Sequence, residues 1–250
     1  MPEKLGNYTV PNNLLDNRII LITGAGDGIG RALAKACGSH GATTVLLGKT
    51  ISKLESVYDE IEANGGPQPG IYPMDLLGAN WDDHCDLAAT LGKEYGRLDG
   101  LVHNAGILGD LSPINHQDTV TWQKVLHVNL NAPFMLTKAC FDLLNKSEDA
   151  SVIFTSSGVG RKGRAYWGAY AVSKFGTEGL MQVFADETET GGRIRANCVN
   201  PGKTRTAMRR QAYPGEDPFT LKKPEEILDT YLYLLGPDSK GISGKSFDAQ

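Results

Sequence analysis

The sequence predicts an α/β fold in which helices cover both faces of one doubly wound parallel sheet, and three observations indicate it. Short, continuously apolar runs alternate with longer segments of helical periodicity. The runs lack the alternation of a half-exposed strand, so both faces of each strand are expected to be covered. Glycine provides 30 of 250 residues without a collagen period, which favours turns and close backbone approaches. Strands and helices that alternate at this pace form repeated βαβ units.

The first half of the chain shows this rhythm clearly. A polar arm, residues 1–15, precedes an apolar strand at 18–23. A helix is expected at 29–40, because Ile29, Leu33 and Cys37 stand at helical spacing. The elements that follow are a strand at 43–47, a helix at 52–63 that the run Asn64-Gly65-Gly66-Pro67 ends, a strand at 71–76 and a helix at 78–95.

The second half continues the pattern with longer helices. Strands are expected at 98–103, 151–156 and 194–199, and helices at 119–145 and 168–190. No repeat or linker divides the chain, so residues 1–250 are expected to form one domain. Residues 202–223 interrupt the rhythm with cationic and turn residues. A segment of this kind after the last strands often covers a ligand site, so we expect a substrate lid there.

Composition argues against several classes of protein. Hydrophobic residues make up 40% and charged residues 22%, which excludes a disordered chain. The net charge of −4 counts against a nucleic-acid-binding protein. No run reaches the roughly 18–20 apolar residues of a membrane span, and residues 1–17 lack the apolar core of a secretion signal. We therefore expect a cytoplasmic protein that binds neither nucleic acid nor membrane.

Cysteines and histidines give no sign of a metal site. The four cysteines, at positions 37, 85, 140 and 198, are at least 48 residues apart, so no CxxC pair exists. The five histidines form no H-x-x-x-H pair. We expect buried free thiols in a reducing compartment, and no metal.

A glycine-rich loop joins the first strand to the first helix. The segment 23–30, Thr-Gly-Ala-Gly-Asp-Gly-Ile-Gly, does not match G-x-G-x-x-G but matches T-G-x-x-x-G-x-G through Gly24, Gly28 and Gly30. Between a strand and a helix, such a loop lets a pyrophosphate approach the free N–H groups of the helix N-terminus. It predicts a Rossmann-type dinucleotide site, with a purely structural turn as the alternative.

Lys49 indicates which dinucleotide is preferred. An NAD site usually has Asp or Glu about 20 residues after the glycines, but Gly48 stands there and Lys49 follows. A cation at this place can meet a 2′-phosphate, which favours NADP and makes NAD the weaker choice. Asp27 argues the other way, since it would repel that phosphate, and Lys49 could also be an ordinary solvated lysine.

Polar residues at strand ends and on two helices indicate a catalytic site. Tyr170 and Lys174 are four residues apart in a predicted helix and so share one face. This pair alone is weak. Other polar residues strengthen the case for a catalytic site. Ser157 follows the fifth strand, Asn129 lies within a helix, and the runs Asn104-Ala105-Gly106 and Asn200-Pro201-Gly202 follow two other strands.

Through these ordered motifs, from about Leu15 to Gly202, the chain resembles the short-chain dehydrogenase/reductases of similar length. The 202–217 stretch and the ending Phe247-Asp248-Ala249-Gln250 are also similar to a bacterial oxidoreductase subgroup of unsettled substrate. The resemblance implies an oxidoreductase that transfers a hydride between NADP(H) and a carbonyl or alcohol.

The resemblance also implies roles for four catalytic residues. Tyr170 would be the general acid in reduction and the base in oxidation. Lys174 would lower the pKa of that phenol and hold the ribose hydroxyls. Ser157 would orient the substrate oxygen, and Asn129 would anchor a water that relays protons to Lys174.

The cofactor would be held by the glycine loop and by the ends of the later strands. Asn104 would lie near the adenosine ribose, Asp75 would meet the adenine amino group, and Pro201 and Thr204 would pack against the nicotinamide. The full set that the resemblance implies is Gly24, Gly28, Ile29, Gly30, Lys49, Asp75, Asn104, Ala105, Gly106, Tyr170, Lys174, Pro201, Gly202 and Thr204. Two departures from the family are His103, where Asn is usual, and an ending without Asp-Gly-Gly.

Other functions have less support. A serine hydrolase needs G-x-S-x-G, which is absent, so the main alternative is a non-catalytic nucleotide sensor on the same fold. Tyr166 and Trp167 could wall the substrate pocket. The cations Arg161, Lys162, Arg164, Lys203, Arg205, Arg209 and Arg210 flank the expected site. They are either solvated loop charges, balanced in part by Glu216 and Asp217, or the sign of an anionic small-molecule substrate.

The two long helices predict self-association. Both 119–145 and 168–190 carry apolar residues on more than one stripe, and only one face can cover the sheet. Apolar residues left over need a second partner or form an exposed patch. In the family that the chain resembles, these helices meet their symmetry mates, so we expect a homodimer or homotetramer; loops covering the outer edges are the alternative.

Overall fold

The computed structural model describes residues 2–6 and 8–250, and these contain the predicted parallel sheet. The strand order is β1-β8-β7-β6-β5-β2-β3-β4, and all neighbouring strands are parallel. The strands are β1 (Glu3–Lys4), β2 (Ile19–Thr23), β3 (Thr43–Gly48), β4 (Gly70–Pro73), β5 (Gly100–His103), β6 (Ala150–Thr155), β7 (Ile194–Asn200) and β8 (Lys245–Asp248). The fold class predicted from the sequence is confirmed.

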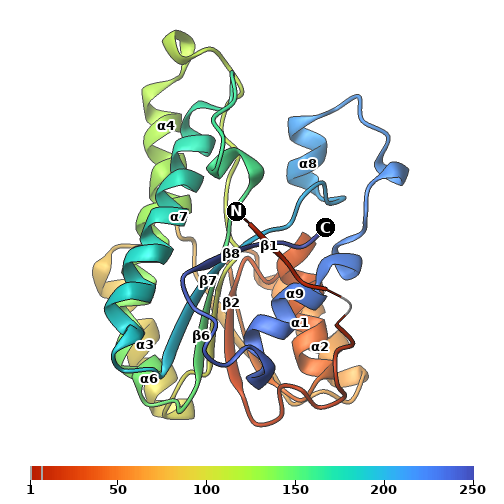
Figure 1. Cartoon of the computed structure of the whole chain (residues 1–250), viewed down its shortest axis with the longest axis vertical. Helices are drawn as coiled ribbons and strands as arrows, with labels where there is room; N and C mark the ends of the chain where they lie inside the picture. The colour runs from red at the N-terminus through yellow and green to blue at the C-terminus, as the bar shows by residue number, and fades with distance from the viewer. Residues whose placement is uncertain (1, 7) are drawn as a thin grey trace.

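Helices cover both faces of the sheet (Figure 1). One face carries α1 (Gly28–Ser39), α2 (Ile51–Ala63) and α9 (Asp229–Leu235); the other carries α3 (Trp81–Tyr95), α4 (Thr119–Leu126), α5 (Ala132–Ala139), α6 (Phe141–Asn145) and α7 (Gly168–Glu189). In β2, Ile20 and Ile22 enter the first core and Leu21 enters the second. This two-sided burial explains why the strand is continuously apolar.

The helix expected at 119–145 is interrupted, so that the prediction of one long helix was wrong. After α4 the chain makes a π-helical turn, His127–Asn131, before α5 begins. Pro133 stands at the start of α5 and has no N–H to continue the α-helical pattern. Such π-turns often mark functional sites, and this one carries Asn129.

The N-terminal arm and the 202–223 segment are more ordered than the sequence indicated. Within the polar arm, β1 pairs with β8, and Leu14 and Leu15 are buried. The short helix α8 (Ala207–Ala212), within the 202–223 segment, stands apart from the two helical layers (Figure 1). None of these elements shows a clear sequence pattern, because each is too short for a period to be recognised.

The described residues contain neither a membrane-spanning helix nor a cluster of metal ligands. None of their helices combines the length and apolar character needed to cross a membrane. They also contain no group of three His, Cys, Asp or Glu side chains able to hold a metal ion. The four cysteines are free as predicted; Cys37, Cys140 and Cys198 are buried, whereas Cys85, also expected to be buried, is only half-buried.

Candidate active site

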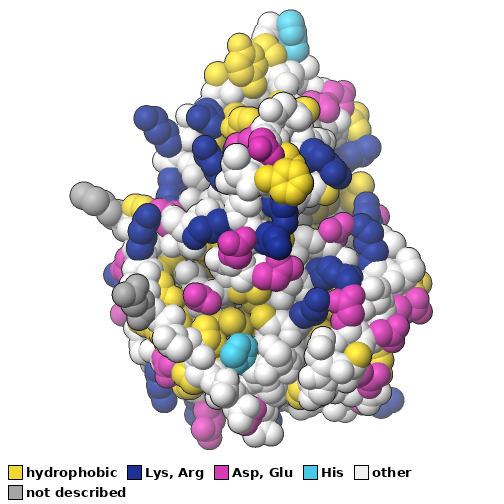
Figure 2. Space-filling model, turned by 90° about the vertical axis from the view of Figure 1, so that its right-hand side faces the viewer, with side chains coloured by type: hydrophobic (Ala, Val, Ile, Leu, Met, Phe, Trp, Pro, Cys, Tyr) yellow, Lys and Arg dark blue, Asp and Glu magenta, His cyan; other side chains and the backbone are white. Residues whose placement is uncertain are grey.

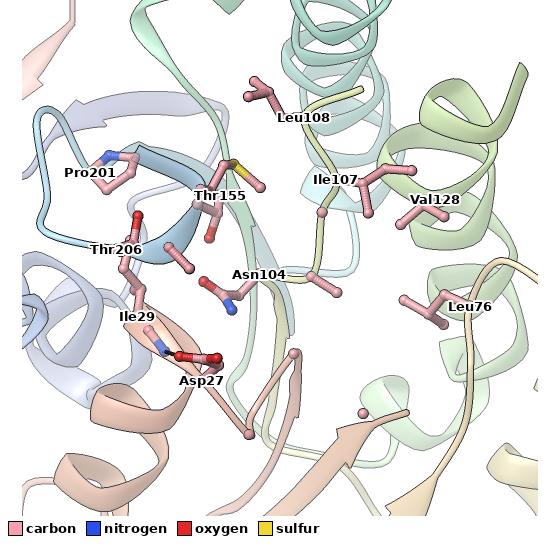
Figure 3. A pocket seen from close by; sticks show the side chains of 18 of the residues that line it. Asp27, Ile29, Leu76, Asn104, Ile107, Leu108, Val128, Thr155, Pro201 and Thr206 are labelled. Atoms are coloured by element: carbon pink, nitrogen blue, oxygen red, sulfur yellow. Dashed lines mark hydrogen bonds between the residues drawn. The ribbon is translucent and has the colours of Figure 1, made fainter. Parts of the chain in front are cut away.

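A cavity of about 480 Å³ opens at the carboxyl ends of β2 and β5 (Figure 3). Gly24 follows β2 and Asn104 follows β5. These two strands are neighbours at the point where the strand order reverses, from β5 outward in one direction and from β2 outward in the other. Ligands of open α/β sheets bind at such a switch point.

The cavity brings most of the predicted site residues together. Its wall includes Gly24, Gly28, Ile29, Lys49, Asp75, Asn104, Ala105, Gly106, Ser157, Tyr170, Lys174, Pro201, Gly202 and Thr204. Gly30 and Asn129 are not part of the wall. Both lie behind the wall. Gly30 packs closely against Gly24 and Asn104, and Asn129 forms hydrogen bonds with Ile107.

The glycine loop has the backbone shape that its sequence predicts. Gly24 and Gly28 have φ values of 67° and 52°, which favour glycine. A Cβ at Gly30 would overlap the Gly24 carbonyl and the Asn104 amide. The Asn104 amide in turn donates to the Thr23 carbonyl at 3.1 Å. The loop thus exposes its backbone and the first turn of α1 to the cavity, which fits a pyrophosphate.

Asp27 does not leave an uncompensated negative charge at this loop. Its carboxylate accepts a hydrogen bond from the Gly28 N–H at 2.7 Å and another from the Lys53 ammonium at 2.5 Å. The bond from Lys53 holds the pKa of Asp27 below its usual value. Lys49 is exposed at the same edge of the cavity. The repulsion that Asp27 would exert on a 2′-phosphate is therefore reduced.

Tyr170 and Lys174 lie on α7 and face the end of β6. Tyr170 is buried, and burial raises the pKa of its phenol to about 12, against an opposing hydrogen bond from Ser157. Lys174 donates from Nζ to the Thr155 carbonyl at 2.7 Å, and its Nζ lies 5.7 Å from the centre of the Tyr170 ring. Burial lowers the pKa of Lys174 to about 8. At neutral pH the site therefore holds a protonated phenol beside an ammonium.

Asn129 holds the wall from behind, in the π-helical turn. Its amide donates to the Ile107 carbonyl at 2.9 Å and to Ser173 Oγ at 3.1 Å, and its Oδ1 accepts from the Ile107 N–H at 2.8 Å. These bonds fix the segment after β5 against α7. The role of Asn129 in a water relay stays a prediction.

The 202–223 segment supplies another part of the cavity wall. Thr206, Met208 and Ala212 line the cavity, together with Trp167 from the loop before α7. The Tyr213 ring lies 5.9 Å from Trp167 and 3.8 Å below the Arg209 guanidinium. Tyr166, expected to wall the pocket, is not in the wall and is 60% exposed.

Six of the seven predicted cations are paired or exposed, and the seventh, Arg205, is half-buried with its guanidinium 5.8 Å from the Phe219 ring centre. Arg209 binds Glu216 through two hydrogen bonds of 2.6 Å, and Arg161 is held by Glu178 and Asp248. Lys162, Arg164, Lys203 and Arg210 are exposed. Figure 2 looks onto the side that carries α8 and shows Lys and Arg side chains around an exposed hydrophobic side chain.

Sequence reasoning missed two kinds of residue here. Ile107 and Leu108 are apolar wall residues on an irregular segment, and Met208 is one on the short helix α8, where no sequence period indicates which side chains face the cavity. Glu178 is buried one turn beyond Lys174. Its spacing of four from Lys174 was a usable signal, because it places a carboxylate on the same face of α7 as Tyr170 and Lys174.

Comparison with known proteins shows the family. Residues 18–217 match the family model for short chain dehydrogenase, so the chain belongs to the short-chain dehydrogenase/reductases, a family of oxidoreductases. It is 51% identical over 244 residues to the uncharacterized oxidoreductase YciK of Escherichia coli K12, with 98% of this chain and 96% of YciK covered.

Two solved structures of close relatives contain a cofactor. A short chain dehydrogenase from Shigella flexneri 2a complexed with NADP is 51% identical, with a TM-score of 0.94 over 96% of this chain and 100% of that chain. One from Escherichia coli CFT073 complexed with NADPH is 53% identical, with a TM-score of 0.93 and the same coverage.

Proposed function

We propose that this protein interconverts a carbonyl compound and an alcohol with NADP(H), using Ser157, Tyr170 and Lys174, with Asn129 in support. One observation carries the proposal: the buried Tyr170–Lys174 pair and the glycine loop line the same cavity. The glycine loop would hold the pyrophosphate of a dinucleotide, and the part of the cavity that Tyr170 lines would receive its nicotinamide. The bound cofactor supplies or accepts the hydride.

The chain's own residues would handle the proton. Ser157 Oγ would donate a hydrogen bond to the substrate oxygen and orient the carbonyl. Tyr170 would give its proton to that oxygen as the alcohol forms, and its raised pKa keeps the proton available at neutral pH. In the oxidative direction Tyr170 accepts the proton from the alcohol. The Lys174 ammonium stabilises the phenolate that forms in reduction.

The preference for NADP(H) is proposed from the edge of the cavity around Lys49. Gly48 leaves no carboxylate for a ribose 2′-hydroxyl, Lys49 supplies a cation, and Asp27 is bound to Lys53. The NADP and NADPH complexes of the two relatives support the same choice.

The substrate class is proposed from the wall near Tyr170. Leu108, Trp167 and Met208 are apolar or aromatic, so the body of the substrate is expected to be apolar. Lys203 and Arg210, two exposed cations of the 202–223 segment that lie outside the cavity wall, favour a substrate with an anionic group. The free buried thiols fit a cytoplasmic protein. The exposed apolar side chains on the outer faces of α5 and α7 fit a homodimer or homotetramer.

A screen of carbonyl compounds tests the proposal against the non-catalytic sensor. The expected result is NADPH consumption with at least one apolar, preferably anionic, ketone or aldehyde, and none in Tyr170→Phe. NADPH binding without turnover across aliphatic, aromatic and anionic carbonyls would favour the sensor. Absence of NADPH binding would exclude both functions.

A further inference from the structure

Glu178 is a buried carboxylate that the proton chemistry above does not use. It is 7% exposed, one turn beyond Lys174 on α7. Its Oε1 accepts hydrogen bonds from Ser156 Oγ at 2.5 Å, Ser246 Oγ at 3.0 Å and Arg161 Nε at 3.2 Å. Burying a carboxylate is unfavourable unless it is paired and hydrogen-bonded. Three donors on one oxygen indicate a site built to keep a negative charge in this place.

Thr155, the last residue of β6, and the two serines that follow it interact with three residues of α7. The Thr155 carbonyl accepts from Lys174, Ser156 Oγ donates to Glu178, and the Ser157 hydroxyl interacts with Tyr170. The helical residues 170, 174 and 178 are four apart and so share one face. Glu178 is thus the third link in the row that holds the catalytic strand end against the catalytic helix.

Arg161 connects this row to β8, the strand next to the sheet edge formed by β1. Its guanidinium donates to Ser246 Oγ at 2.6 Å, to the Phe247 carbonyl at 3.1 Å and to Asp248 Oδ1 at 2.6 Å. Asp248 Oδ1 also accepts from the Asn200 amide at 2.8 Å. Strand β8 therefore anchors Arg161, and Arg161 anchors Glu178.

Glu178 is also placed to act on the charge of Lys174. The groups that face Lys174 are Tyr170 and Glu178 on its own helix, His103 on β5 and Cys198 on β7, with Arg161 and Asp248 beyond Glu178. Burial lowers the pKa of His103 to about 3 and raises that of Cys198 well above its usual value. Both are neutral near pH 7, so Glu178 is the carboxylate that favours the charged form of Lys174.

We propose that Glu178 is a positioning residue: anchored by Arg161 and β8, it holds the 155–157 strand end against α7 and keeps the Lys174 ammonium charged beside Tyr170. The inference rests on the proposed function for its catalytic meaning. The charge of Lys174, however, can be measured without cofactor or substrate.

The experiment follows the Lys174 side chain by NMR in protein labelled with ¹³C at lysine Cε. The resonance is assigned by its loss in Lys174→Met and is then followed with pH. The wild-type midpoint is expected near 8. In Glu178→Gln it should fall by about one unit, the low end of the shift that a nearby opposite charge produces. The matched control, Glu187→Gln, changes an exposed carboxylate on the same helix and should keep the wild-type midpoint.

A second variant separates charge from shape. Gln is nearly isosteric with Glu but neutral, whereas Asp is shorter and keeps the charge. If Glu178 acts as proposed, the midpoint in Glu178→Asp lies closer to wild type than that in Glu178→Gln; a purely structural role gives the reverse order. An unchanged midpoint in folded Glu178→Gln overturns the proposal.

Two further outcomes are an unfolded Glu178→Gln variant and a wild type without turnover. If Glu178→Gln does not fold, Glu178→Asp replaces it, because this change keeps the negative charge but draws it away from Lys174 by one methylene group. A smaller downward shift then supports the proposal, and no shift overturns it. Failure of the wild type to oxidise NADPH with any carbonyl would count against the proposed function. The titration would still show whether Glu178 helps to keep Lys174 charged.

Discussion

The ammonium of Lys174 donates a 2.7 Å hydrogen bond to the carbonyl oxygen of Thr155, the last residue of β6. Both residues are buried, at 5% and 8% exposure. The bond fixes the lysine amine between the strand end and the Tyr170 ring, so the protein itself sets the position of the cation. Binding energy of a cofactor is then not needed to order this side chain.

Removing the Tyr170 hydroxyl is expected to remove turnover and leave cofactor binding. Tyr170→Phe keeps the ring, which packs against Trp167 at 5.7 Å, and loses only the proton donor. We expect NADPH consumption to fall by about 10²–10⁴-fold, the usual contribution of a general acid, while the NADPH dissociation constant from fluorescence titration changes little. Tyr58→Phe, on α2 and outside the cavity wall, is the control. Full activity of Tyr170→Phe would remove the proposed mechanism.

Reversing the charge of Lys49 is expected to reduce the preference for NADPH over NADH. Lys49→Asp loses a cation that faces the cavity edge and gains a carboxylate able to bind ribose hydroxyls. A charge-assisted hydrogen bond contributes about 1.5–3 kcal/mol, so NADPH affinity should fall at least about tenfold while NADH affinity is kept or rises. Lys240→Asp, exposed and outside the cavity wall, serves as the control in the same titrations. Equal or tighter binding of NADH by the wild type would contradict this assignment.

The pH dependence of reduction should follow the protonation state of Lys174. Burial lowers the pKa of Lys174 to about 8 and raises that of Tyr170 to about 12. As pH rises, the lysine therefore loses its charge before the phenol loses its proton. We expect kcat/KM for reduction to be level between pH 6 and 7 and to fall above about 8, because the phenolate then forms without its cation. A profile that stays level to pH 10 would show that the charge of Lys174 is not required.

The same pKa shift predicts a contribution to stability. The folded protein releases the Lys174 proton near pH 8, whereas an unfolded lysine keeps it until about 10.5. Between these values the unfolded chain binds more protons at this residue, so its contribution makes the free energy of unfolding rise with pH. Urea unfolding of the wild type and Lys174→Met at pH 7 and pH 10 measures it, and the difference between the two proteins should change by a few kcal/mol at most. A difference that is the same at both pH values would contradict the lowered pKa.

The parts of the site that the sequence predicted are those tied to strand ends. Gly24, Asn104, Ser157 and Pro201 each follow a buried parallel strand closely, and such strands end at a common edge. Once the strands are recognised, these residues must meet. The helical pair Tyr170–Lys174 was predictable for a related reason, because a spacing of four fixes a shared face.

The parts that were missed depend on contacts between distant segments. The π-helical turn around Asn129 lies just before Pro133 and contacts α7 through the Asn129–Ser173 hydrogen bond, and local periodicity does not contain that information. Arg161 was predicted as a cation near the substrate, yet it turns to Glu178 and to Asp248, 87 positions along the chain. Only the pairing of β8 with β7 brings that aspartate into reach.

Self-association through α5, α6 and α7 is the last prediction. Leu136 and Met181 on the inner faces are buried, whereas Phe134, Phe175 and Val183 are 50%, 46% and 56% exposed. A patch of this kind on a monomer marks an interaction surface, and two copies related by a two-fold axis would cover it. Phe175→Asp combined with Val183→Asp should place carboxylates in that contact. Light scattering should then give the mass of one chain, against at least twice that mass for the wild type, with NADPH binding retained. Phe219→Asp, an 84% exposed phenylalanine on the 202–223 segment, should leave the assembly unchanged. A wild-type mass of one chain at every micromolar concentration would show that the exposed side chains have no partner in a second copy.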